Sequence, residues 1–523
     1  MSQHSIYSKF TATAACLMIL ACGSNYALAA DSANAVVETS GVKGGLVVVI
    51  GCDSPALLEG LRGAGAYLVH GLDVDPKKVS AARQYLGKKN LYGPVTVSRL
   101  RGPQLPYTDS LVNLIVITRN GPKIPTDEMM RALAPLGVIA DIRKGKIEIT
   151  RKPWPENLDE WTHYLHNASN NAVSGDTTVG PPRGIRWTCG PKYARSHEHI
   201  ASVSAMVTAS GRIFYIIDEG PISSVYMPPK WKLVARDAFS GVLLWKKPIS
   251  DWESHLRGFR SGPPEIGRLL VARGEKVYVA LGYAKSVTVL DAATGKELAS
   301  LRGTEGAGEL LLAGKRLYVL ADDMTRQEYD RRKKWIDRTV PKLEIIWRFP
   351  RTPIRMYGTQ RVVAINTAGG ELLWKRQFEE PGEIMPTTLA VDAGKVCLQT
   401  VSHLVCLDAA SGKDVWRSER AVAKSRFAWS TPTLVIHDGV VLTIDRAVKD
   451  NADKSPPDKG SKWIISSGGS EIVQKAQMFA FALDSGKNLW RAPYFENYNV
   501  PQDVFVIDGA VWTGAVRRGL DPG

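Results

Sequence analysis

The sequence predicts a multidomain protein in which an α/β Rossmann-like domain precedes an all-β propeller. Two patterns support this fold class. Between Gly44 and Glu148, buried apolar runs alternate with helical stretches. From Ser204 onward, one short motif recurs at spacings typical of propeller blades. The chain has 523 residues, of which 44% are hydrophobic and 23% charged, and this composition excludes a wholly disordered or fibrous protein.

These patterns divide the chain into four segments. We expect a signal peptide over residues 1–29, the Rossmann-like domain over 30–150, a bridge rich in Trp and His over 151–200, and the propeller over 201–523. About five and a half blades fit into the last segment, which ends within a blade. Because an unclosed propeller leaves costly open sheet edges, we expect it to be C-terminally incomplete relative to its natural unit.

The N-terminus has the features of an export signal. Lys9 precedes an apolar run over residues 10–22, and Ala27 and Ala29 are the small residues that a signal peptidase needs. A second interpretation is a lipoprotein box in which Cys22 carries a lipid anchor. Both interpretations place the protein in the periplasm or cell envelope. No later stretch is long and apolar enough to predict a transmembrane span.

The elements of the first domain can be placed one by one. Continuous apolar runs predict strands buried on both faces, because the crossover helices of a parallel sheet cover both of its sides. Stretches with helical periodicity lie between them. The predicted strands are 46–50, 67–73 and 111–117, and the predicted helices are 56–61 and 77–86.

Three short stretches of this domain carry a family resemblance. They are Gly71-Leu72-Asp73-Val74-Asp75-Pro76, Leu105-Pro106-Tyr107 and Arg131-Ala132-Leu133-Ala134-Pro135-Leu136-Gly137. In this order they resemble class I S-adenosylmethionine-dependent methyltransferases. The resemblance implies that Asp73 accepts hydrogen bonds from the ribose hydroxyls of the cofactor. It also implies a cofactor-binding pocket formed by Gly51, Asp53, Asp73 and Pro106.

The departures from this family fall at the cofactor site. Val49 stands where the family has an acid, and Arg101 stands where an acid would meet the adenine amine. Only Gly51 remains of the glycine-rich turn, since Asp53 and Pro55 replace the next two glycines. The sequence therefore favours a retained fold with an eroded site. A working methyltransferase and a site for another nucleotide remain as alternatives.

Four of the nine histidines lie in the bridge: His163, His166, His197 and His199. His163 and His166 would share one helix face, where Asp159 or Glu160 could complete a zinc or copper site. The sequence has no H-E-x-x-H signature. We therefore favour the alternative, in which Trp and His side chains pack the bridge against the propeller with ordinary hydrogen bonds.

Two of the six cysteines are predicted to lie in one hairpin. Cys397 and Cys406 fall in strands 395–400 and 403–408, and a two-residue turn would place them opposite each other. They would either form a disulfide after export or pack as small buried hydrophobic side chains. The chain contains no CxxC, CxxCH or adjacent cysteine pair, so the sequence gives no support for a zinc ribbon, a thioredoxin motif or haem attachment.

The repeated motif reads Asp, two residues, Thr or Ser, Gly, three residues and Trp, with single substitutions in several copies. We expect the glycine to turn the chain and the Trp to pack between neighbouring blades. An apolar strand pair with a Gly-containing turn precedes each copy. The five copies contain Gly241, Gly295, Gly370, Gly412 and Gly486.

These copies resemble the pyrroloquinoline quinone (PQQ) propeller repeat. That family includes quinoprotein dehydrogenases and non-catalytic scaffolds, such as an outer-membrane assembly lipoprotein. The resemblance therefore implies the fold and leaves the activity open. The adjacent cysteine pair of the dehydrogenases is absent from this sequence, and neither calcium ligands nor a catalytic base can be assigned. The pairing of the two domains resembles a family of exported planctomycete-type proteins.

We expect a non-catalytic binding or scaffold protein of the cell envelope, with a protein or envelope component as its partner. The net charge of +15 favours anionic surfaces only in general terms, and we expect no nucleic acid. The first alternative is a methyltransferase that uses S-adenosylmethionine. The second is a PQQ-dependent dehydrogenase. An export signal argues against the first, because that cofactor is made in the cytoplasm.

Overall fold

The computed structural model describes most of the chain between residues 32 and 513. Within these residues, no helix is long and apolar enough to cross a membrane. The chain divides into two compact units: the first contains residues 1–158, 177–189 and 235–245, and the second contains the rest. The described residues are 32–182, 184–190, 203–223, 227, 229–250, 266–283, 285–325, 327–328, 330–331, 334, 358–422, 433–446, 474–496 and 504–513.

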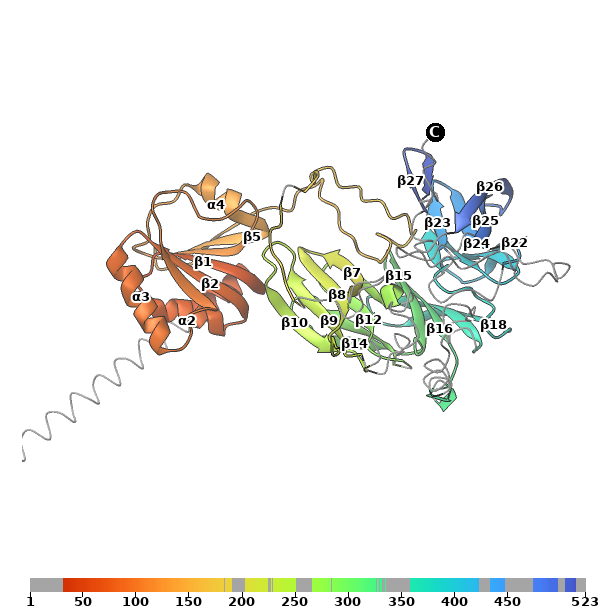
Figure 1. Cartoon of the computed structure of the whole chain (residues 1–523), viewed down its shortest axis with the longest axis horizontal. Helices are drawn as coiled ribbons and strands as arrows, with labels where there is room; N and C mark the ends of the chain where they lie inside the picture. The colour runs from red at the N-terminus through yellow and green to blue at the C-terminus, as the bar shows by residue number, and fades with distance from the viewer. Residues whose placement is uncertain are drawn as a thin grey trace, which may run out of the picture. The chain divides into compact units, whose positions relative to one another are not determined.

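The first unit contains a six-stranded sheet in the order β3-β2-β1-β4-β5-β6 (Figure 1). Its first five strands are parallel, and β6 is antiparallel to β5. The predicted Rossmann-like fold is confirmed. Residues 32–40 are also helical. The elements are β1 (Gly44–Ile50), α2 (Pro55–Gly63), β2 (Ala66–Asp73), α3 (Pro76–Lys88), β3 (Val95–Arg99), β4 (Val112–Ile117), α4 (Thr126–Ala132), β5 (Leu133–Asp141) and β6 (Glu148–Arg151).

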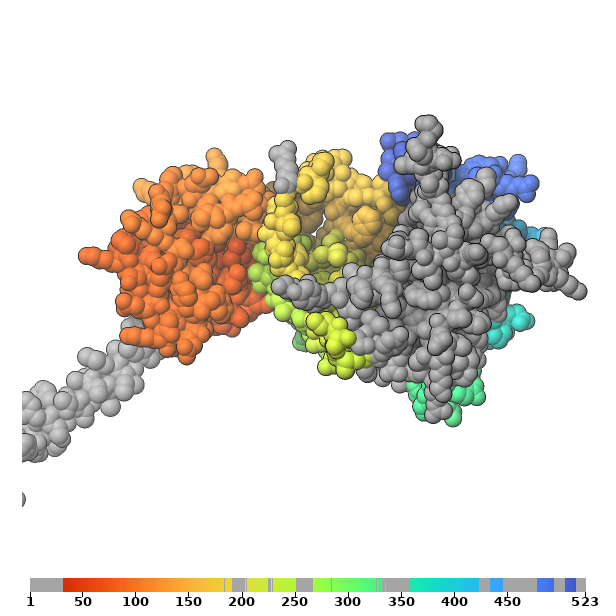
Figure 2. All heavy atoms as spheres, in the orientation of Figure 1, coloured from red at the N-terminus to blue at the C-terminus, as the bar shows by residue number. Residues whose placement is uncertain are grey.

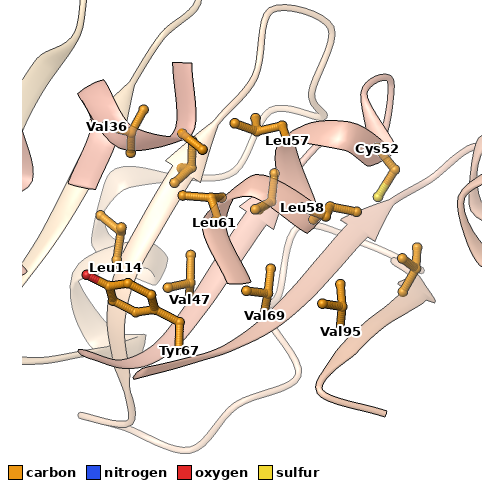
Figure 3. Packing of buried hydrophobic residues seen from close by; sticks show 14 of the residues in the cluster. Val36, Val47, Cys52, Leu57, Leu58, Leu61, Tyr67, Val69, Val95 and Leu114 are labelled. Atoms are coloured by element: carbon orange, nitrogen blue, oxygen red, sulfur yellow. The ribbon is translucent and has the colours of Figure 1, made fainter. Parts of the chain in front are cut away.

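Both faces of this sheet are covered, as the continuous apolar runs predict. On one face, Val47 and Val69 pack with Leu58 and Leu61 of α2 and with Val36 (Figure 3). On the other face, residues such as Val48 and Ile50 of β1 pack in a second core with Met129 and Ala132 of α4. Consecutive residues of β1 alternate between the two cores, so nearly the whole strand is buried.

Six further sheets follow in chain order: five have four strands and the last has two among the described residues. The predicted all-β, propeller-type architecture is confirmed, and each sheet is called a blade below. The blades are β7 (Val203–Ala209), β8 (Arg212–Asp218), β9 (Trp231–Asp237), β10 (Leu243–Pro248); β11 (Leu270–Arg273), β12 (Lys276–Ala280), β13 (Val287–Asp291), β14 (Glu297–Leu301); β15 (Ala307–Ala313), β16 (Arg316–Asp322), β17 (Gln360–Asn366), β18 (Leu372–Phe378); β19 (Ala390–Asp392), β20 (Lys395–Gln399), β21 (His403–Asp408), β22 (Asp414–Glu419); β23 (Thr433–His437), β24 (Val440–Arg446), β25 (Gln474–Ala482), β26 (Asn488–Glu496); β27 (Val504–Ile507), β28 (Ala510–Thr513).

The repeated motif forms the contact between neighbouring blades. The indole N–H of Trp374 donates to the carbonyl of Ala409 in the next blade at 3.1 Å, and the ring lies over Gly412. Trp416 makes the same pair of contacts with Leu483, at 2.8 Å, and with Gly486. Both glycines have a positive φ, near 70°, which a residue with a Cβ rarely adopts. The structural roles expected for the Trp and the Gly are therefore confirmed.

Candidate functional site

The first candidate site lies at the carboxyl ends of β1 and β4. The strand order reverses between these two strands, and open α/β sheets bind ligands at such a switch point. A cavity of about 220 Å³ is present there, smaller than the roughly 300–1,000 Å³ of typical ligand pockets. Figure 2 shows the face of residues 32–150 that is turned to the viewer, coloured red to orange, as a convex surface without a deep hollow. The cavity is lined by Ser32, Asp53, Ser54, Leu57, Thr118, Arg119, Asn120 and Ile142.

Gly51 lies in this crevice, but the loop after β4 packs directly on it. A Cβ at Gly51 would clash with the Thr118 hydroxyl and would lie 2.7 Å from the Cα of Gly121. A Cβ at Gly121 would in turn clash with the Ile50 carbonyl. The two loops therefore need both glycines in order to approach each other. In this arrangement the Gly51 backbone faces protein atoms at the place where a cofactor would lie.

Asp73 ends β2 beside Gly51, and it is 1% exposed. One carboxylate oxygen accepts the Cys52 N–H at 2.8 Å, and the other accepts the Asp75 N–H at 2.9 Å. Burial, followed by the charges of Asp73 and Asp53, raises the pKa of the Cys52 thiol to about 12. Asp73 thus organises the loop after β1, and because its side chain is buried, a ribose could reach the remaining lone pairs only if that loop moved.

The remaining predicted cofactor residues face other partners. Asp53 forms an ion pair with Lys78 at 2.6 Å. Pro106 is exposed in the loop before β4. Glu128 accepts the Leu105 N–H beside it at 2.7 Å, and Arg131 pairs with Glu128 at 2.7 Å. The structure thus brings Gly51, Asp53 and Asp73 together and places Pro106 in a separately anchored loop.

Sequence reasoning missed one polar pair in this unit. The Tyr107 hydroxyl lies 2.6 Å from Nδ1 of His70 on β2. Burial, and then the charge of Arg83, lowers the pKa of His70, while burial raises the pKa of Tyr107. No sequence motif contains both residues, because they are 37 positions apart, one on a strand and the other in a loop.

The second candidate site belongs to the second unit and is formed by residues Asp159–Asp176, which we call the hub segment. It bonds to the first strand of all six blades, in chain order. The carbonyls of Trp161, Thr162, Ala168 and Ser169 accept the N–H groups of Thr208, Ala272, Val391 and Ile436 at 2.7, 3.0, 2.7 and 2.9 Å. His163 Nε2 accepts the Leu312 N–H at 2.9 Å, and Asn171 Oδ1 accepts the Val506 N–H at 2.8 Å.

The hub segment gives each bridge histidine a specific partner. His163 is buried and accepts the Leu312 N–H, so its ring is neutral. Burial, followed by the charges of Arg273 and Arg268, lowers the pKa of His163 to about 3. His166 Nε2 lies 2.8 Å from a carboxylate oxygen of Asp159.

The helix expected over these two histidines is not present. Residues 163 and 166 pair instead as an isolated antiparallel bridge, and His166 has a φ of 67° that a helix does not allow. In the part of the chain that the structure describes, no group of three or more His, Cys, Asp or Glu side chains could hold a metal ion. His197 and His199 lie outside the described residues.

The Asn170 side chain joins the hub segment to three distant positions of the second unit. Its Oδ1 accepts from Arg268 at 2.6 Å, and its Nδ2 donates to the carbonyls of Leu389 and Leu434 at 2.8 and 2.9 Å. The fully buried Arg268 also lies 3.5 Å from Glu309, and burial raises the pKa of Glu309 to about 7. No sequence pattern identifies Asn170, because its side-chain partners lie more than 90 residues away.

A cavity of about 570 Å³ opens beside the hub segment, in the size range of ligand pockets. The turns between the first two strands of several blades form its rim. Arg273 and Arg316 contribute positive charge, and Asp392 and Asp438 contribute negative charge. The lining is Asn167, Ala168, Ser169, Arg273, Leu312, Ala313, Gly314, Arg316, Tyr318, Val391, Asp392, Ala393, Gly394, Ala409, Ile436, His437 and Asp438.

Comparisons with known proteins give a family match for the second part of the chain and similar solved structures for both parts. A family model described as "Outer membrane protein assembly factor BamB" matches residues 230–491. The crystal structure of BamB from Moraxella catarrhalis is 14% identical with a TM-score of 0.29, and the match covers 55% of this chain and 61% of that one. The chain thus matches less than two thirds of the length of that protein.

The N-terminal part is similar to solved methyltransferase structures. A putative S-adenosyl-L-methionine-dependent methyltransferase from Methanococcus maripaludis is 19% identical, with a TM-score of 0.21, over 22% of this chain and 56% of that one. A SAM-dependent methyltransferase from Aquifex aeolicus is 22% identical, with a TM-score of 0.19, over 20% of this chain and 60% of that one. No curated protein sequence matches the chain.

Proposed function

Because the chain belongs to the family described as outer membrane protein assembly factor BamB, we propose that it is a non-catalytic scaffold of the cell envelope that binds a protein partner through its propeller. The observation that carries this proposal is the hub segment. It forms hydrogen bonds with the first strand of each of the six blades. A segment of the protein therefore occupies the position on these strands where a propeller enzyme would bind a ligand.

The position of the hub segment favours a binding role for the propeller over PQQ-dependent oxidation. A propeller enzyme holds its cofactor in or above the central channel of the blades. Here a quinone on these inner strands would have to displace hydrogen bonds of the hub segment and the buried contact between Asn170 and Arg268. The residues present therefore do not fit PQQ at this position, and no step through it is derived.

The crevice in the first unit fits S-adenosylmethionine equally poorly. Asp73 already accepts two backbone N–H groups, Gly51 packs on the loop after β4, and the cavity that remains is about 220 Å³. These contacts support a structural or protein-binding role for the Rossmann-like unit. They give no support to methyl transfer as the activity of the chain.

The cavity beside the hub segment is the first surface to test for a partner. A photo-crosslinking amino acid at Ala393 or Asp438, both on its rim, should give discrete protein adducts in cells that export the chain. The same amino acid at Lys88, in α3, serves as the control. Equal labelling from all three positions would contradict a specific propeller site.

Calorimetry of the full chain tests the enzymatic alternative directly. Titration with S-adenosylhomocysteine should give no heat at millimolar ligand, with Asp73→Ala as the companion variant. Micromolar binding that is lost in Asp73→Ala would overturn the proposal, and methyl transfer would become the favoured function.

A further inference from the structure

The fourth blade holds two cysteines directly opposite each other. Cys397 on β20 pairs with Cys406 on β21, as expected from the two-residue turn between the strands. Both thiols are free and 0% exposed. Burial, followed by the neighbouring Cys406, raises the pKa of Cys397 well above its usual value.

The hydrogen-bond register makes this pair suitable for a covalent bond. Next to the turn, Thr400 donates its N–H to the His403 carbonyl at 2.7 Å, which marks a hydrogen-bonded pair. Bonded and non-bonded pairs alternate along an antiparallel ladder, so Cys397 and Cys406 form a non-bonded pair. Such pairs have Cα atoms about 4.5 Å apart with their side chains close together, within the range of about 4.4–6.8 Å seen in disulfides.

The third and fifth blades show which side chains stand at this place when cysteines do not. The same row of the ladder holds Tyr318 opposite Ala364 in the third blade and Leu442 opposite Ala480 in the fifth. In each, a large side chain faces a small one, and the next residue across is the motif Trp. The fourth blade keeps its Trp, Trp416, but replaces the large and small pair by two cysteines.

From this register, and from the two cysteines that replace a large and a small side chain, we infer that Cys397 and Cys406 form a cross-strand disulfide when the chain folds in the presence of a disulfide oxidant. One thiolate attacks the oxidant and releases a first thiol, and the second cysteine then displaces the other thiol. Two cysteine thiols and one oxidant disulfide thus become one protein disulfide and two reduced thiols. The protein loses two electrons and two protons.

Packing fixes when this reaction can occur. The fifth blade covers the pair through Leu434, Ile436, Val441 and Phe481. An oxidant therefore reaches the thiols before that blade docks, and a reductant cannot reach the finished bond in the folded chain. The inference does not depend on the proposed scaffold role, because it concerns the hairpin alone.

A mass measurement tests the inference on the full chain. The chain is refolded in mixed oxidised and reduced glutathione, unfolded in guanidinium with iodoacetamide, and digested with trypsin. Both cysteines fall in one tryptic peptide, Val396–Lys413. That peptide should be two hydrogens lighter and carry no alkyl group. Cys52, which lies in the separate peptide Gly44–Arg62, should be alkylated. Two alkyl groups on Val396–Lys413 without prior reduction would overturn the inference.

A matched variant separates the bond from the packing. Cys397→Leu with Cys406→Ala recreates the pair found in the fifth blade and cannot be oxidised. Wild-type chain that is unfolded, reduced and then refolded with reductant present should have a lower guanidinium midpoint than the oxidised chain, and the same treatment should leave the midpoint of the variant unchanged. Equal midpoints for oxidised and reduced wild-type chain, together with two alkylated cysteines, would exclude the disulfide.

Discussion

The two units differ in how they fill the place where their folds usually hold a ligand. In the first unit, neighbouring loops close the switch point through local contacts, since Gly51 meets Gly121 and Asp73 binds Cys52. In the second unit, one distant segment fills the middle and bonds to all six blades. Local closure leaves a small cavity that a few substitutions could reopen. In the second unit, the hub segment occupies the ligand position, and its hydrogen bonds there contribute to the stability of the whole propeller.

We expect the largest loss of stability from a substitution in the hub segment, and it tests whether this segment stabilises the propeller. Asn170→Ala removes one acceptor of the buried Arg268 and the donor to Leu389 and Leu434. Arg268 keeps Glu309 and the Thr387 carbonyl as partners, but three buried hydrogen bonds are lost, and each buried group left unsatisfied costs about 1–3 kcal/mol. Guanidinium unfolding followed by tryptophan fluorescence should show this loss. Asn167→Ala, which removes only the acceptor of two hydrogen bonds from nearby Ser169, should change the midpoint much less. Similar losses in both variants would contradict a central role for Asn170.

The second prediction concerns pH and the same buried network. Burial raises the pKa of Glu309 from 4.5 to about 7, so the folded state binds more protons than the unfolded state between these values. Stability from this group is fully present below pH 4.5 and falls as the pH rises through 7, by at most about 3 kcal/mol.

Glu309→Gln removes that titration, so the variant should lose less stability than the wild type between pH 5 and 7. His163 contributes the opposite slope, because its lowered pKa of about 3 makes stability rise up to pH 6.5. Unfolding curves at several pH values measure the difference between the two proteins. Parallel pH profiles would contradict the titration of Glu309.

A smaller effect is expected in the first unit. Asp73→Ala leaves the buried Cys52 N–H without its acceptor, which costs about 1–3 kcal/mol. Asp73→Asn retains one acceptor oxygen and should lose less. Thermal unfolding of both variants gives the comparison. If Asp73→Ala were neutral, the carboxylate would be available to a ligand, and the contrast between the two units would weaken.

The smallest effect concerns the contact between blades. Trp416→Phe keeps the ring over Gly486 but removes the hydrogen bond to Leu483, which should cost about 1 kcal/mol. Trp490→Phe is the matched control at an equivalent position that is 40% exposed. Its midpoint in guanidinium should stay close to that of the wild type. If Trp490→Phe lowered the guanidinium midpoint more than Trp416→Phe, the hydrogen bond from Trp416 to the next blade would not be a source of stability.

The sequence predicted those features that local pattern encodes. Continuous apolar runs located β1, β2 and β4, and the repeated motif located the contact of Trp374 with the next blade. The end of β2 at Asp73 was also predicted. Periodicity carries this information because each element must bury one or both of its faces.

Features that depend on distant partners were not predictable in this way. The proposed helix over His163 and His166 was wrong, since their backbones pair with each other in a tight bridge and the His163 side chain binds the inner strand of the third blade. Asn171 meets Val506 across 335 positions, and no spacing rule connects them. The acceptor role of Asp73 toward Cys52 depends on how one loop bends after β1, which the sequence alone does not specify.

The order of the hub contacts has a consequence for synthesis. The segment precedes every blade in the chain, and its bonds reach from Thr208, 47 positions from Trp161, to Val506, 335 positions from Asn171. Synthesis and export both proceed from the N-terminus, so the acceptors become available before the strands that use them. Each blade can therefore dock as it emerges, on a template that is already present. Moving this segment to the C-terminus would leave the contacts intact but present the acceptors last, so refolding in vitro should change little while the yield of folded, exported chain should fall.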